Sequence, residues 1–334
     1  MISELRLGTR GSELALWQAN AVAARIADAG GPSCRVVVIK TTGDRLQDAP
    51  LSEVGGKRLF VKEIEDALLR GEIDLAVHSS KDMPAILPDG LTIAAVLPRE
   101  EPLDAVVLPV AHQMSAISQQ PSAITSIDAL VARLGQSPSI GTGSVRRIAQ
   151  LTRLFPGARF TPIRGNLDTR LRKLDQGAHD ALVLAAAGLR RLGFADRISF
   201  ALPADACVPA PGQGIVAVEI RSADVDVRDA VSRIDDPDAA AALAAERALV
   251  EALGGGCQTP VGALATPIDR DRIEIVAAVI ALDGSKAVRG RGDAPRSDAA
   301  ALGARIGAQL IADGADDILA EAARAHGAVE GIQP

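Results

Sequence analysis

The sequence predicts an α/β protein with two doubly wound lobes and a smaller C-terminal α+β domain. Strand-like and helix-like segments alternate over the first hundred residues, the alternation restarts after Leu103–Pro109, and the pattern changes after Asp235-Asp-Pro237. At 334 residues the chain is also longer than one ordinary domain. We expect domain 1 to comprise residues 1–100 and 213–234, domain 2 residues 101–212 and domain 3 residues 235–334.

The first lobe is predicted to contain a mostly parallel sheet. Leu5–Gly8, Arg35–Lys40 and Ile73–His78 are strand-like, and the second of these contains three consecutive valines that suggest burial. Ser12–Gly30 and Lys57–Arg70 carry apolar residues at helical spacing, and the first of these helices begins with a residue suited to an N-cap. Strands separated by helices favour parallel pairing.

The second lobe repeats this pattern, and the C-terminal part departs from it. Extended segments at 139–141, 159–164 and 180–184 alternate with helical segments at 144–154 and 166–174. An alanine-rich helix over 239–253 precedes alternating strands around 272–282 and 286–292 and a helix over 299–312. The polar stretch His112–Thr125 is expected to be an exposed loop.

Composition narrows the class of protein. Hydrophobic residues make up 48% of the chain and aromatic residues only 2%, so aliphatic side chains must build the cores. The pI near 5.4 and the scarcity of aromatic rings argue against nucleic-acid binding. No apolar run is long enough to span a bilayer, and the first residues do not resemble a signal peptide. Three widely spaced cysteines and four histidines make disulfides or a zinc site unexpected, which fits a cytoplasmic protein.

One strongly basic window stands out in this acidic chain. Between Gly141 and Lys173 there are eight basic residues and one acidic residue, whereas the whole chain has a formal charge of −6. The window includes two short turns, Gly141-Thr-Gly-Ser144 and Arg164-Gly-Asn166, each of which could open a helix. Helix N-termini and arginine side chains both bind carboxylate or phosphate. The window therefore predicts a site for an anionic small ligand.

Three further segments could carry chemistry. Cys257 follows three glycines in a loop that could present its sulfur to a cleft, although a small buried apolar residue is the ordinary interpretation. Lys81 and Asp82 follow a strand directly, where ligands of parallel sheets usually bind, although a solvated charged turn is an equal alternative. Gly43–Lys57 is polar and glycine-containing, so it is predicted to be a mobile lid or else an ordinary long loop.

Taken together, the motifs resemble the hydroxymethylbilane synthase (porphobilinogen deaminase) family. They occur in the family's order and cover essentially the whole chain. The segments are Thr9-Arg-Gly-Ser12, Leu14-Ala-Leu-Trp-Gln18, Val54-Gly-Gly-Lys57, Leu59-Phe-Val-Lys-Glu63, Ala76-Val-His-Ser-Ser-Lys-Asp-Met-Pro84, Gly141-Thr-Gly-Ser-Val-Arg-Arg147, Arg164-Gly-Asn166, Thr169-Arg-Leu171, Ala187-Gly-Leu189, Pro209-Ala-Pro-Gly-Gln-Gly214 and Gly255-Gly-Cys-Gln-Thr-Pro260.

The resemblance implies a monomeric, cytoplasmic transferase of porphyrin and heme biosynthesis with lobes of the periplasmic-binding-protein-like type. It implies a dipyrromethane cofactor bound covalently to Cys257 and no metal. The implied reaction joins four porphobilinogen molecules head to tail with loss of ammonia. Hydrolysis then releases the linear tetrapyrrole hydroxymethylbilane, which would pass to a uroporphyrinogen-forming enzyme.

The resemblance also implies roles for individual residues. Asp82 is expected to be catalytic. Other expected contacts are, for the cofactor, Lys81, Ser144, Arg146, Arg147 and Arg164; for substrate, Arg10, Ser12, Thr142, Arg170 and Arg191; and for the lid, Lys57 and Phe60. The chain departs from the family's usual pattern at Gly143, where a serine is common, and at Arg58, where a glycine is common.

Two other functional classes remain as alternatives. A non-catalytic anion-binding protein of the two-lobed periplasmic type would have similar lobes, but the apparent lack of a signal peptide and the extra C-terminal domain argue against it. A nucleic-acid binder using the basic window would show affinity for DNA or RNA that depends strongly on salt. The mass of a covalently attached dipyrrole would distinguish the transferase from both.

Overall fold

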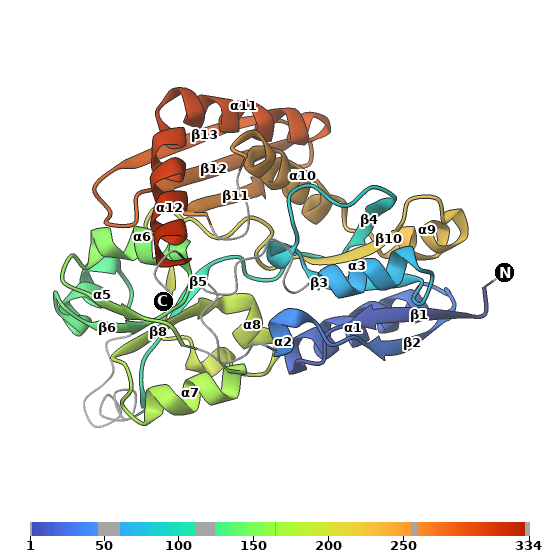
Figure 1. Ribbon diagram of the computed structural model, residues 1–334, viewed down its shortest axis with the longest axis horizontal. Coiled ribbons are helices and arrows are strands. Elements are labelled where there is room, and N and C mark those ends of the chain that lie inside the picture. Colours follow the sequence, from blue (N-terminus) through green and yellow to red (C-terminus); the bar gives the residue numbers. More distant parts are fainter. Residues whose placement is uncertain (1, 46–60, 111–123, 164, 255–258, 331–334) are drawn as a thin grey trace.

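The computed structural model describes residues 2–45, 61–110, 124–163, 165–254 and 259–330. Within these ranges the chain forms three sheets, each covered by helices (Figure 1). Of the residues predicted to be functional, Lys57, Phe60, Arg164 and Cys257 lie outside the described ranges, as do most of the lid segment and of the predicted loop His112–Thr125.

The first two sheets have five strands each and the same topology. The first has the order β2-β1-β3-β10-β4 and the second β7-β6-β8-β5-β9. In each, one strand (β10 or β5) runs antiparallel to its two neighbours. The strands are β1 Glu4–Thr9, β2 Ser33–Val38, β3 Leu75–Ser79, β4 Leu91–Val96 and β10 Val216–Arg221 in the first sheet, and β5 Asp104–Val107, β6 Ser139–Gly141, β7 Arg159–Thr161, β8 Ala181–Ala185 and β9 Phe200–Leu202 in the second.

Helices cover both faces of each sheet, which confirms the doubly wound fold. The helices associated with the first sheet are α1 Glu13–Asp28, α2 Thr42–Arg45, α3 Lys62–Leu69, η1 Ser80–Asp82, α9 Val225–Val231 and η3 Ser232–Ile234. Those associated with the second are α5 Ile127–Leu134, α6 Val145–Leu154, α7 Leu167–Asp175, α8 Ala186–Arg191 and η2 Ala195–Arg197. One core cluster in the first lobe joins α1 and α9 to the sheet, and another joins α3 to it.

The chain passes between the two sheets twice. Residues 97–103 lead from β4 to β5, and residues 203–215 lead back from β9 to β10. The second sheet is therefore built from one continuous stretch, whereas the first takes its antiparallel strand from after the second crossing. These two crossing segments lie between the lobes and contribute directly to the site described below.

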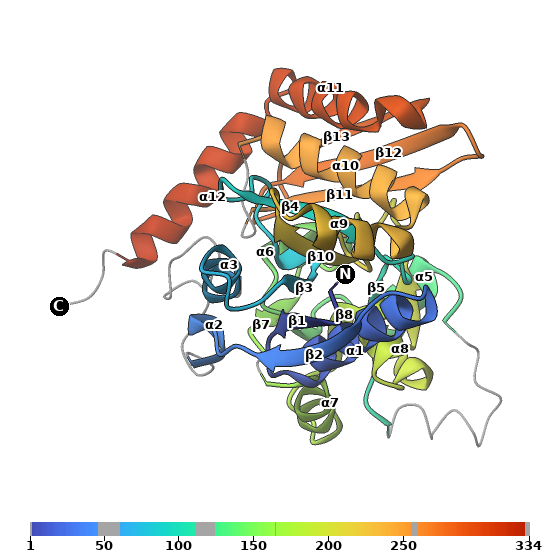
Figure 2. The ribbon, with the colours of Figure 1, turned by 90° about the vertical axis from the view of Figure 1, so that its right-hand side faces the viewer.

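The C-terminal part forms a three-stranded antiparallel sheet with helices (Figure 2). Its elements are α10 Pro237–Ala252, β11 Val261–Pro267, β12 Arg272–Ile280, β13 Ala287–Pro295, η4 Arg296–Asp298, α11 Ala299–Ala312 and α12 Ala315–Glu330. One face of this sheet packs against α10, α11 and α12. The opposite face contributes Leu264, Ala278 and Ile280 to a smaller core with Ala149 of α6 and Val208 of the second crossing.

One predicted strand differs in its surroundings. The valine-rich segment forms β2 as expected, but β2 is half-exposed and Val38 has 52% of its surface accessible. The reason is its position at the edge of the sheet, where it pairs with β1 alone.

None of the described helices is long and apolar enough to cross a membrane.

Candidate active site

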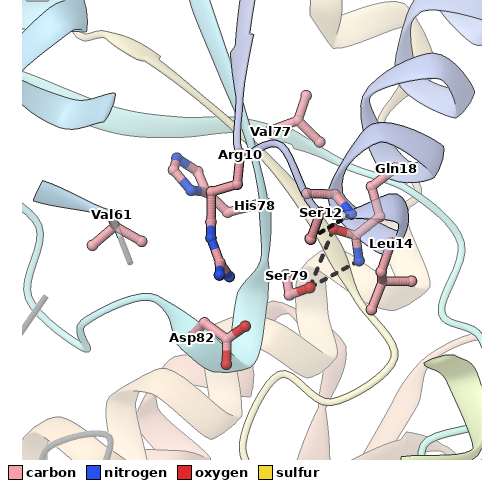
Figure 3. Close-up of a pocket in the computed structure, with 10 residues that line it drawn as sticks. Arg10, Ser12, Leu14, Gln18, Val61, Val77, His78, Ser79 and Asp82 are labelled. Carbon is pink, nitrogen blue, oxygen red and sulfur yellow. Dashed lines mark hydrogen bonds between the residues drawn. The ribbon is translucent and has the colours of Figure 1, made fainter. Parts of the chain in front are cut away.

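A small pocket of about 70 Å³ lies at the carboxyl ends of β1 and β3 (Figure 3). These strands are parallel neighbours, so the residues that follow them meet at one edge of the sheet. Arg10 and Ser12 enter from the loop after β1, while His78 and Asp82 come from the end of β3 and from η1. The structure therefore brings three of the predicted site residues, Arg10, Ser12 and Asp82, into one pocket.

Local hydrogen bonds hold this wall of the pocket. Ser12 is the N-cap of α1, and its Oγ accepts from the backbone N–H of Ala15 at 3.3 Å. Arg10 Nη2 lies 2.5 Å from Asp44 Oδ1, on the short helix α2. Burial opposes ionisation of Asp44, but hydrogen bonds and charge from Arg10 outweigh it and lower the pKa of this carboxyl. Arg10 thus enters the pocket with its charge partly balanced.

Lys81 and Asp82 occupy the short helix η1 that follows β3. Burial lowers the pKa of Lys81 to about 8, and the nearby charge of Asp82 only partly opposes this effect. Beside them, the buried Oγ of Ser80 has no hydrogen-bond partner among the described residues. Solvent-shielded polar atoms without partners are uncommon in folded proteins, so this edge is suited to a polar ligand.

A buried cluster of two arginines and one aspartate lies next to η1. Arg146 Nη1 is 2.6 Å from Asp104 Oδ2, and Arg147 Nη2 is 2.7 Å from Asp104 Oδ1. Burial alone would raise the pKa of Asp104, but the two guanidinium charges hold it well below its usual range. With one carboxylate against two guanidiniums, this buried arginine cluster carries a net charge of +1. The charges of both arginines also reach Lys81 and contribute to its lowered pKa.

The buried arginine cluster connects both crossing segments to α6. Asp104 begins β5 at the end of the first crossing. Gln213, from the second crossing, donates from Nε2 to Asp104 Oδ1 at 3.0 Å, and Arg146 Nη1 donates to the carbonyl of Val208 at 2.7 Å. Cys207 also contacts Asp104, and burial, followed by the charge of Asp104, raises the pKa of its thiol to about 12. Cys207 is therefore a protonated structural group.

The turn before α6 contributes hydroxyl groups at the second-lobe edge. Ser144 is the N-cap of α6, and its Oγ accepts from the N–H of Arg147 at 3.5 Å. Thr142 is buried, and its Oγ1 accepts from the N–H of Ser144 at 3.3 Å. A Cβ atom at Gly143 would meet only Pro162, at 4.0 Å, so crowding does not explain the glycine at this position.

Two other predicted arginines lie apart from this pocket. Arg191, at the end of α8, donates from Nη2 to the carbonyl of Gly214 at 2.7 Å, and its guanidinium carbon lies 5.5 Å from the ring centroid of Trp17. Burial lowers the pKa of Arg191. Arg170 lies on α7 and donates to the carbonyl of Gly165 at 2.9 Å. Arg191 therefore lies between the lobes, whereas Arg170 lies on the α7 side of the second lobe.

Sequence reasoning missed the acidic partners of the site. Asp104 was part of an apolar stretch, and its only signal was one charge at the start of an otherwise aliphatic strand. His78 contacts Glu219, and the sequence pattern identifies neither residue as the partner of the other. A carboxylate within the apolar segment that became β10 was the available signal for Glu219. Among the described residues, no group of three potential metal ligands occurs.

The fold and the site together define a two-lobed α/β protein with a cationic site between its lobes and an acidic residue at a strand end. The family model for "Porphobilinogen deaminase, dipyromethane cofactor binding domain" matches residues 5–229, and the model for the porphobilinogen deaminase C-terminal domain matches residues 240–312. The chain belongs to the porphobilinogen deaminase family, whose cofactor is dipyrromethane.

Individual relatives match this chain in sequence over almost its full length. The chain is 43% identical over 322 residues to porphobilinogen deaminase of Citrifermentans bemidjiense, covering 96% of this chain and 95% of the relative. It is 45% identical over 323 residues to that of Pelotomaculum thermopropionicum, covering 96% and 98%. Among solved structures, the periplasmic VFT2 domain of Bordetella pertussis BvgS is 16% identical with a TM-score of 0.38, covering 70% of this chain and 86% of that one.

Proposed function

We propose that this transferase joins four porphobilinogen molecules head to tail with loss of ammonia and then hydrolyses the chain to hydroxymethylbilane. The observation that carries this proposal is the proximity of two features in a member of this family. The pocket containing Asp82 adjoins a buried arginine cluster with a net positive charge. Porphobilinogen bears two carboxylates and loses a leaving group to become a cation, so it requires both features.

Asp82 is proposed to stabilise the positive charge that develops as ammonia leaves. A fixed carboxylate in a partly dry pocket stabilises such a charge more strongly than water does. The substrate's acetate and propionate groups are assigned to the residues around the two lobes. The proposed substrate contacts are Arg10, Ser12, Thr142, Arg170 and Arg191. Because Arg10 is paired with Asp44, substrate binding would require a carboxylate to share or replace that partner.

The donor groups of the site fit a dipyrromethane cofactor with its carboxylates. The net charge of the buried arginine cluster, the ammonium of Lys81 and the unpartnered Oγ of Ser80 all favour a polar anion at this edge. The residues proposed to hold it are Lys81, Ser144, Arg146, Arg147 and Arg164, with Cys257 as the covalent attachment. When bound, the cofactor supplies the pyrrole carbon to which the first substrate unit is joined.

The wider assignments are also proposals. We propose the domain limits given by the sequence, which the positions of the two crossings support, and we assign Lys57 and Phe60 to a lid over the pocket. We propose a monomeric cytoplasmic enzyme that passes its product to a uroporphyrinogen-forming enzyme.

Intact-mass measurement tests the proposal directly. The purified protein should exceed its chain mass by one dipyrrole, and brief exposure to porphobilinogen should add further pyrrole units. Cys257→Ser should fold but have the bare chain mass, because the serine hydroxyl is a far weaker nucleophile than a thiolate. Cys34→Ser, at the half-buried edge strand β2, is the matched control and should resemble the unmodified protein. A dipyrrole retained by Cys257→Ser would refute the attachment site.

A further inference from the structure

His78 and Glu219 form a buried pair immediately behind the pocket. His78 Nε2 lies 3.1 Å from Glu219 Oε2, and their side chains are 3% and 0% exposed. His78 is near the end of β3 and Glu219 is on the neighbouring antiparallel strand β10, where it lies opposite Ala76. The pair therefore occupies the face of the sheet that α3 covers, in a layer otherwise made of Ile64, Leu68 and similar residues.

The hydrogen bond determines which ring nitrogen is available to a ligand. An ionised carboxylate can only accept hydrogen bonds, so Nε2 must carry the proton that is shared with Glu219. The lone pair of a neutral imidazole is then on Nδ1. Such a partner fixes both the tautomer and the orientation of a histidine ring, as carboxylates do for histidines in catalytic and metal sites.

His78 also lines the same pocket as Arg10 and Asp82 (Figure 3). Glu219 Oε1 is buried and has no hydrogen-bond partner among the described residues, so this carboxylate is held inside the fold mainly by His78. Glu65 of α3 is likewise fully buried on the helix face that packs here. His78 is thus placed between the buried carboxylate of Glu219 and the pocket that contains Asp82.

We propose that His78 is the proton acceptor of the condensation step and that Glu219 is its positioning residue. This inference rests on the proposed function. Ammonia leaves with the electrons of the C–N bond, and the free α-carbon of the acceptor pyrrole donates an electron pair to the resulting methylene carbon to form the C–C bond. The α C–H bond then breaks, its electrons restore the aromatic ring, and its proton moves to Nδ1 of His78. Transfer of that proton to the departing ammonia regenerates the neutral imidazole.

A proton acceptor other than Asp82 is needed because the proposed role of Asp82 requires its carboxylate to keep its charge. A carboxylate that stabilises a cation acts best when it stays ionised throughout the step, whereas a proton acceptor must change its charge. Two groups in different environments, one at the pocket and one backed by a buried carboxylate, can divide these roles. The carboxylate in contact with His78 is that of Glu219 from β10, and the charged residues that line the same pocket are Arg10 and Asp82.

The first test replaces the ring while keeping its hydrogen bond. His78→Gln retains an N–H that can donate to Glu219 but has no basic nitrogen. We expect unchanged cofactor mass, a similar melting temperature and condensation slower by roughly 10²–10⁴-fold in a single-turnover assay. His179→Gln, which removes a half-buried histidine of the second lobe, is the control and should change neither the cofactor mass nor the condensation rate.

The second test does not depend on turnover. Ring ¹⁵N signals of the four histidines should show that Nε2 of His78 carries a proton, with its signal identified by its loss in His78→Gln. Glu219→Gln removes the carboxylate that orients the ring, so condensation should slow while the cofactor mass stays unchanged. A ring protonated only at Nδ1, or an unchanged rate in His78→Gln, would overturn the assignment. If the unmodified enzyme did not consume porphobilinogen, the proposed function itself would fail, whereas the ring signals would still report the tautomer.

Discussion

Arg146 Nη1 lies 2.6 Å from Asp104 Oδ2, and neither side chain is more than 5% exposed. This contact joins the first residue of β5 to the first turn of α6 at the point where both crossing segments meet. Because Gln213 and the carbonyl of Val208 bind the same two side chains, the position of the lobes and the position of the cationic site depend on one set of hydrogen bonds.

Asp104→Asn should destabilise the second lobe strongly. It would leave two buried guanidiniums without a counter-charge, which typically costs about 3–5 kcal/mol. The free energy of local opening can be measured by amide hydrogen exchange in β8. Glu72→Gln breaks an exposed pair with Arg70 and should leave exchange unchanged. Equal exchange in both variants would show that Asp104 is dispensable to the network.

Lys81 should make anion binding sensitive to alkaline pH. Its pKa is lowered by burial from 10.5 to about 8, so it loses its charge as the pH rises through about 8. In cofactor-free protein, affinity for a pyrrole dicarboxylate measured by calorimetry should decrease over that range. Lys81→Arg should shift the decrease to higher pH. Its contribution to folding has the opposite sign, because between about 8 and 10.5 the unfolded state binds more protons and stability rises with pH.

Asp82→Asn should preserve the shape of the pocket and remove its negative charge. We expect single-turnover consumption of porphobilinogen to slow by on the order of 10²-fold or more, the range seen when a group that stabilises transition-state charge is removed. Asp89→Asn, at an exposed turn on the same lobe, is the control. Near-normal turnover in Asp82→Asn would leave this residue without the catalytic role.

Glu246→Gln should loosen the C-terminal unit. Glu246 accepts from Arg99 Nη1 at 2.6 Å, from the N–H of Ala265 at 2.7 Å and from the N–H of Gly212 at 2.6 Å, and it is fully buried. An amide cannot accept from all three donors, so the β11 amides should exchange faster. Glu274→Gln, which removes a partly exposed partner of Arg291, should leave them unchanged. Slow exchange in both variants would count against this role for Glu246.

Features set by neighbouring residues were predictable from the sequence. Ser12 and Ser144 were expected at helix starts and do cap α1 and α6, because a cap depends on a few adjacent residues. The placement of Asp82 after β3 was predictable for the same reason. It needed only a strand pattern followed by charged residues.

Features set by distant residues were not predictable in this way. Asp104 and Gln213 are 109 positions apart, and no local pattern indicates that they share a hydrogen bond. The exposure of β2 depends on its place at the edge of the sheet, which the valines of β2 do not encode. Likewise, the pairing of Arg146 and Arg147 with Asp104 could be seen only in the structure. The two arginines alone indicated attraction for anions, but not the buried carboxylate that partly neutralises them.

The insertion of β10 between β3 and β4 has a consequence for synthesis on the ribosome. When the first hundred residues have emerged, β4 has no strand to pair with and β3 has an open edge. Both conditions persist while the whole second sheet is being made, since β10 ends only at Arg221. Open strand edges favour pairing with other chains, so a chain arrested before β10 is prone to aggregate. The sheet of the first lobe therefore cannot be completed until β10 has been synthesised. The sheet of the second lobe can be completed as soon as β9 has been synthesised.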